Sequence, residues 1–125
     1  MQVDTRYIGV CAAAGLALGW IPSLLHGPSP DKFAILHIDG SAVWAWHLAR
    51  SLIGLVVGVA ALPRRWYVRG PLCGAAAILP LTLVSRAMPA CGYPCMFWNL
   101  ISASLLGLLV AAAAFAITGR SSSID

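Results

Sequence analysis

The sequence predicts an all-α integral membrane protein, a single-domain bundle of four transmembrane helices with both termini in the cytoplasm. Two observations of composition support this fold class. Of the 125 residues 60% are hydrophobic and only 10% are charged, whereas soluble domains carry about 25% charged residues. The third observation is the length of the apolar runs: there are four, and each is close to the ~20 residues that cross a bilayer. The predicted spans are residues 7–25, 41–62, 71–88 and 96–118.

The first span follows Arg6 and ends at a turn near Pro22. A secretory signal peptide is the alternative interpretation, since a cation precedes an apolar core, but no small-residue cleavage site follows. Gly15 and Gly19 are four residues apart, a spacing that lets two helix backbones approach closely. We therefore expect this span to stay in the mature protein and to pack against another helix.

The second span contains His47 and Arg50 inside an otherwise apolar run. A central arginine costs about 2.5–3.5 kcal/mol on insertion scales and survives by reaching headgroups, finding a partner or lining a wet cavity. At helical spacing both residues fall on one stripe with Gly54 and Gly58. That stripe is polar and small, so this helix face is the most informative feature of the sequence.

The connection between the second and third spans orients the protein. Arg64, Arg65 and Arg69 lie within it, and loops rich in arginine remain in the cytoplasm. We therefore place residues 63–70 inside, with the 26–40 and 88–95 connections on the outer side.

Proline and small residues mark the remaining spans. Pro80, near the centre of the third span, predicts a helix kink. In the fourth span Asn99, Ala103, Gly107 and Ala111 repeat every four residues, which predicts a second close-packing face. The polar residues 119–125 are expected to be disordered.

The candidate ligand site is built on the second span. Arg50 would anchor an anionic group such as a lipid phosphate, a carboxylate or a quinone oxygen, and His47 would be a second donor. Its wall would be formed by amphipathic residues at similar depth, namely Trp44, Trp46, Asn99 and Ser102. Two alternatives stay open. Arg50 could snorkel to the outer headgroups while His47 bonds between helices, or His47 could ligate a haem or chlorophyll.

Cysteines in the outer connection form a second candidate site. Cys91 and Cys95 are expected to form a disulfide that staples this loop on the oxidising side of the membrane. The alternatives are thiol–disulfide exchange and a soft-metal site, because two thiols with the thioethers of Met88 and Met96 suit Cu(I). Cys11 and Cys73 are expected to be buried and inert, on opposite halves of the bilayer.

Several functional classes are excluded or unsupported. The formal charge of +4 comes from cations that flank the spans as topological anchors, so no nucleic-acid role is indicated. Glutamate is absent and the four aspartates lie outside the apolar runs, which excludes paired-carboxylate catalysis within the membrane. No motif supports an enzyme, and no cofactor is assigned.

The sequence thus predicts a small protein of a bacterial inner membrane that binds or transports a small anionic or lipid-like ligand around His47 and Arg50. One alternative is an accessory subunit of a larger membrane complex, docked through its small-residue faces. The other is thiol redox or soft-metal chemistry at Cys91 and Cys95. In each case we expect the chain to form a homo-oligomer or to join a larger assembly.

Overall fold

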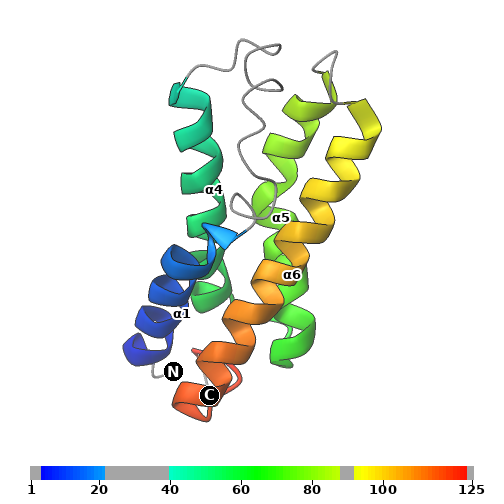
Figure 1. Cartoon of the computed structure of the whole chain (residues 1–125). Helices are drawn as coiled ribbons and strands as arrows, with labels where there is room; N and C mark the ends of the chain where they lie inside the picture. Colours follow the sequence, from blue (N-terminus) through cyan, green and yellow to red (C-terminus); the bar gives the residue numbers. More distant parts are fainter. Residues whose placement is uncertain (1–3, 22–39, 88–91, 124–125) are drawn as a thin grey trace.

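The described part of the chain is all-helical and contains no strand (Figure 1). A computed structural model describes residues 4–21, 40–87 and 92–123. Its helices are α1 (Thr5–Leu18), α4 (Gly40–Val59), α5 (Trp66–Ala87) and α6 (Gly92–Thr118). The predicted helical class is confirmed for these residues.

Two helices of the described part are long and apolar enough to cross a membrane. The stretches are Trp66–Val84 in α5, with a mean hydropathy of 1.4, and Met96–Thr118 in α6, with a mean hydropathy of 2.4. The apolar helical stretches Thr5–Leu18 and His47–Val59 are shorter. By length and composition, the described helices thus provide two of the four predicted spans.

The helices pack as two pairs, α5 with α6 and α1 with α4. Helices α5 and α6 lie side by side along their lengths (Figure 1). The two pairs meet through contacts of α6 with α1 and of α4 with α5 and α6. The start of α1 and the segment after α6 lie at the end of the bundle where α5 begins (Figure 1); we call this the terminal end.

Glycines allow the backbones of both helix pairs, α1–α4 and α5–α6, to approach closely. A Cβ atom added to Gly15 would lie 2.6 Å from the Cα atom of Gly54, so α1 and α4 touch backbone to backbone. A Cβ atom on Gly70 would lie 2.9 Å from the Cβ atom of Ala111 on α6, and one on Gly107 would overlap the carbonyl oxygen of Gly70. Both small-residue stripes therefore lie inside the bundle.

Helices α5 and α6 begin five and four residues before their predicted spans. Helix α5 starts at Trp66, which places Arg69 inside the helix instead of in the arginine-rich loop. The sequence Gly70–Pro71 suggests a helix break, but Gly70 is needed here for the close approach to α6. Helix α6 starts at Gly92, because a proline in the first turn, here Pro94, removes a donor that has no helical partner.

The described residues after α6, 119–123, contact the start of α1. Gly119 has a φ of 69°, a left-handed conformation that ends the helix. Ser122 and Ser123 are 4% and 2% exposed, and the backbone N–H of Asp4 donates to the Ser123 carbonyl at 2.8 Å. The disorder expected for residues 119–125 stays a prediction.

Candidate ligand-binding site

Arg50 lies inside the bundle, on the face of α4 that meets α6. Its side chain is only 7% exposed, and its Nη2 donates to Oδ1 of Asn99 at 3.3 Å. The structure thus brings together two of the predicted site residues from different helices. A snorkelling arginine would instead extend along the lipid-facing surface.

The register of α4 explains this position. Ile53 and Val57 follow Arg50 at helical spacing and are both 0% exposed, while Leu48 and Leu52 point outward at 61% and 53% exposure. Turning Arg50 outward would therefore expose the core face of the helix. Hydrogen bonds to a buried guanidinium are worth about 1.5–3 kcal/mol and offset part of its desolvation.

An aromatic cluster surrounds His47, one turn before Arg50. The His47 ring lies against Trp20, with ring centroids 4.2 Å apart, and Trp44 meets Trp20 edge-on at 6.0 Å. Both tryptophans are partly exposed. The sequence analysis missed Trp20, although its place near the end of the first predicted span puts it at the depth of Trp44.

The other predicted wall residues are less closely tied to Arg50. The hydroxyl of Ser102 donates to the backbone carbonyl of Asn99 at 3.1 Å, within its own helix. The side chain of Trp46 lies outside the described residues. The candidate site, which we call the Arg50 site, therefore consists of Arg50, Asn99, His47, Trp20 and Trp44.

A second buried arginine lies at the terminal end. Arg69 is 0% exposed, and its Nη2 donates to the hydroxyl of Tyr7 and to the carbonyl of Ser121. The guanidinium carbon lies 5.4 Å from the centroid of the Tyr7 ring. Its Nε and Nη1 have no hydrogen-bond partner among the residues that the structure describes. The sequence analysis treated Arg69 only as an orientation signal in a loop.

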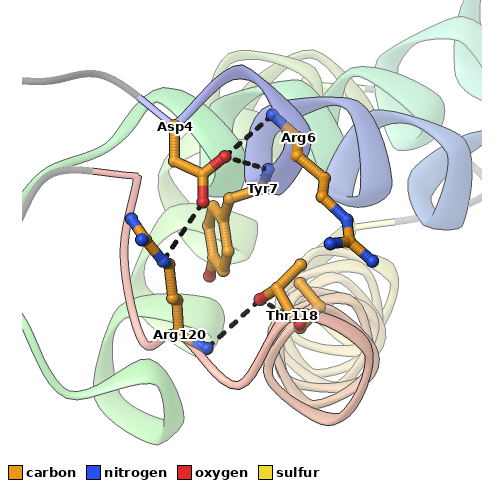
Figure 2. A network of polar contacts seen from close by, with 6 residues as sticks. Asp4, Arg6, Tyr7, Thr118 and Arg120 are labelled. Carbon is orange, nitrogen blue, oxygen red and sulfur yellow. Dashed lines mark hydrogen bonds and ion pairs between the residues drawn. The ribbon is translucent and has the colours of Figure 1, made fainter.

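Figure 2 shows a polar network that joins Asp4, before α1, to Arg120, after α6. One carboxylate oxygen of Asp4 accepts from the backbone N–H groups of Arg6 and Tyr7 at 2.9 and 3.2 Å, which caps α1. The other pairs with Nε of Arg120 at 3.4 Å. An aspartate before an apolar helix is a capping signal, so the cap was predictable from sequence, but its ion pair with the tail was not.

Cys11 and Cys73 both lie toward the terminal end of the bundle, which corrects the expectation that they occupy opposite halves of the bilayer. Helices α1 (Thr5–Leu18) and α5 (Trp66–Ala87) both begin at the terminal end, and Cys11 and Cys73 occur early in these helices. Cys11 and Cys73 are free and buried, as expected.

The outer cysteine site falls mostly outside the described residues. Met88 and Cys91 are not described, and of Cys95 only the backbone in the first turn of α6 is described. Met96 is partly buried on α6. Among the described residues no group of three or more His, Cys, Asp or Glu side chains could hold a metal. The disulfide, redox and metal hypotheses there stay predictions.

Comparison with protein-family models, with curated proteins and with solved structures finds no match to this chain. The functional argument therefore depends on the geometry of the two buried arginines and their neighbours.

Proposed function

We propose that this chain is a four-span protein of a bacterial inner membrane that binds, or carries across, a small anionic or lipid-like ligand at the Arg50 site. One observation carries the proposal, namely a guanidinium 7% exposed in the interior of the bundle. Ionisable side chains at such positions are costly and usually mark ligand or ion sites.

The distribution of apolar side chains supports a membrane location. Large hydrophobic residues lie on the outside of the bundle, whereas glycines, alanines and polar residues occupy much of its inside. Soluble monomers rarely expose such a continuous apolar surface, and lipid chains would cover it. On α4 the exposed residues are Leu48, Leu52, Leu55, Val56 and Val59, and on α6 they include Phe97, Ile101, Leu105 and Leu109.

The chemistry of the Arg50 site suits an amphipathic anion. A guanidinium presents several N–H groups to carboxylate or phosphate oxygens, and His47 offers a second polar group one turn away. Trp20 and Trp44 are partly exposed, so their rings offer a flat apolar surface to the non-polar part of a ligand. A fatty acid or a phospholipid headgroup with its chains combines these properties.

The alternatives receive less support from the described residues. The small-residue faces proposed for docking into a larger complex are occupied by the chain's own helices, as Gly15 on Gly54 and Gly70 on Gly107 demonstrate. An accessory subunit would need another surface. Apart from Met96, the redox and metal hypotheses concern side chains outside the described part of the chain.

Thermal protection by a short-chain phosphatidic acid tests the proposal. In a mild neutral detergent, saturating dihexanoyl phosphatidic acid should raise the unfolding temperature of the wild type by about 5 °C, and dihexanoyl phosphatidylcholine should raise it much less. Arg50→Gln keeps a hydrogen-bond donor for Asn99 but removes the charge, so its shift should fall below about 1 °C.

Arg86→Gln is the matched control. Arg86 is an exposed cation whose Nη2 donates to the hydroxyl of Tyr93 at 2.7 Å, so its loss should leave the protection intact. Equal protection of the wild type and Arg50→Gln would contradict the proposal. Equal loss in Arg50→Gln and Arg86→Gln would do so too, because it would indicate only general electrostatic attraction.

A further inference from the structure

Arg69 is the most completely buried cation of the described chain and is not part of the Arg50 site. A guanidinium has five N–H donors. Those on Nη2 reach the hydroxyl of Tyr7 and the carbonyl of Ser121, while those on Nε and Nη1 are buried without a partner. A buried charge with unsatisfied donors is strongly disfavoured, so this position calls for an acceptor that the described chain does not supply.

Ser123 adds a third unsatisfied group at the terminal end. Within the described chain its hydroxyl is also buried without a partner, and it lies two residues along the tail from Ser121, whose carbonyl Arg69 contacts. The Ser123 carbonyl in turn accepts from the backbone N–H of Asp4 at 2.8 Å. Asp4 lies three residues before Tyr7, whose hydroxyl accepts from Arg69, so the tail and the start of α1 bring Ser123 and Arg69 to the same end of the bundle.

The charge at the terminal end is strongly positive among the described residues. The cations there are Arg6, Arg64, Arg65, Arg69 and Arg120. The described carboxylate at this end is that of Asp4, which already caps α1 and pairs with Arg120 (Figure 2). An anion entering this corner would therefore meet donors and positive charge and no free carboxylate of the described chain.

We propose that Arg69 and Ser123 form a second site, which binds a phosphate group at the terminal end. Phosphate oxygens accept several hydrogen bonds at once and match the planar donors of arginine. Nε and Nη1 of Arg69 donate to the phosphate, and the hydroxyl of Ser123 donates to another of its oxygens. The phosphate belongs either to an anionic lipid of the inner leaflet or to free phosphate from the cytoplasm.

The tail over Arg69 is held in a way that permits entry. Arg120 is 48% exposed where it pairs with Asp4, and exposed ion pairs contribute little to stability. Gly119 already turns the chain away from α6 with its positive φ of 69°. Lifting the segment from Gly119 to Ser123 opens the corner without disturbing the packed glycines of α5 and α6.

Unfolding temperatures in lipid nanodiscs test the phosphate site and show whether the phosphate comes from a lipid headgroup or from solution. Wild-type protein is placed in phosphatidylcholine nanodiscs and titrated with inorganic phosphate, and is separately compared in phosphatidylglycerol nanodiscs without phosphate. A rise of about 5 °C with inorganic phosphate would assign the site to the free anion, and the same rise with phosphatidylglycerol alone would assign it to the headgroup. No rise in either arm would overturn the proposal.

Two variants and a control distinguish this site from general attraction. Arg69→Met removes every donor while filling the same buried space, and should abolish the rise. Ser123→Ala removes one hydroxyl, so about ten times more phosphate should be needed for the same rise in unfolding temperature. This variant tests the site on its own if Arg69→Met does not fold. Arg64 is an exposed cation just before α5, and Arg64→Gln should respond to phosphate as the wild type does. An unchanged response in Ser123→Ala and Arg69→Met, or in Ser123→Ala alone if Arg69→Met is unfolded, would overturn the proposal.

Discussion

Arg50 and Arg69 are the cations that the described fold buries, at 7% and 0% exposure. They are buried in different ways. Arg50 contacts the amide oxygen of Asn99 across two helices, whereas Arg69 contacts the hydroxyl of Tyr7 and a tail carbonyl. For Arg69 both printed acceptors are neutral, so its charge keeps much of its attraction for an anion. This difference from an ordinary ion pair supports the phosphate proposal.

Asn99→Leu should lower the free energy of unfolding by about 1–3 kcal/mol, because it removes an acceptor from a buried guanidinium. The double variant Arg50→Met/Asn99→Leu should recover most of that loss, since it removes the charge together with its partner. Reversible unfolding in mixed micelles measures the coupling between the two positions. Strictly additive effects of the two changes would mean that the hydrogen bond contributes nothing.

At the scale of helices, the α5–α6 pair depends on backbone approach more than on large side chains. Gly70 and Gly74 of α5 face Gly107 and Ala103 of α6 so closely that a Cβ atom on Gly74 would overlap the Ala103 carbonyl. Such contacts allow dispersion and weak Cα–H hydrogen bonds between helices. The pair should therefore tolerate changes on its outer face much better than changes at these glycines.

Gly107→Ala should destabilise the protein by about 1–3 kcal/mol, because the new methyl group forces α5 away from α6. Gly9→Ala is the matched control, since a Cβ atom on Gly9 would meet nothing within 4 Å, and alanine favours helix over glycine by about 1 kcal/mol. Thermal unfolding of both variants in the same detergent gives the comparison. A Gly107→Ala protein as stable as the Gly9→Ala protein would refute close packing here.

The start of α1 is stabilised by two interactions of Asp4, the helix cap and the ion pair with Arg120, whose contributions can be measured separately. Asp4→Ala removes both the helix cap and the pair with Arg120, and should cost about 1–2 kcal/mol. Asp4→Asn keeps the cap and removes only the charge, so it should cost less than about 1 kcal/mol. If the two variants lost equal stability in thermal unfolding, the ion pair would matter more than the cap.

Over the described molecule, glycines, alanines and polar groups occupy much of the inside, and many large apolar residues are outside. The start of α1 and the segment after α6 lie at the terminal end (Figure 1), together with Arg64 and Arg65, which are exposed just before α5. By the positive-inside rule such a cluster stays in the cytoplasm. The whole-molecule prediction is that both chain ends share that side.

Reporter fusions measure this orientation directly. Green fluorescent protein should fluoresce when fused to the C-terminus in bacterial cells, and alkaline phosphatase fused there should be inactive, because it matures only outside the cytoplasm. A fusion of phosphatase within the 26–40 connection should be active and is the positive control. Active phosphatase at the C-terminus would reverse the assigned topology.

Sequence reasoning reached the helical fold through periodicity, and it placed Asn99 in the wall of the Arg50 site through its depth from the outer face. Apolar runs predict helices, and a polar residue on a small-residue stripe points to a neighbouring helix. It did not reach the burial of Arg69, because Gly70 and Pro71 weaken the helix signal locally while the contact with Gly107 outweighs them. The contacts of Trp20 and Ser123 also depend on partners far along the chain, which local patterns do not contain.

The contact between Asp4 and the tail has a consequence for biosynthesis. The backbone N–H of Asp4 and the carbonyl of Ser123 join residues that the ribosome makes at very different times. While Ser123 is still unmade or inside the ribosome, α1 can already pack on α4, but its first turn lacks these partners. The closed arrangement around Arg69 can therefore form only after Ser123 has left the ribosome, so a shorter nascent chain would leave this arginine uncovered.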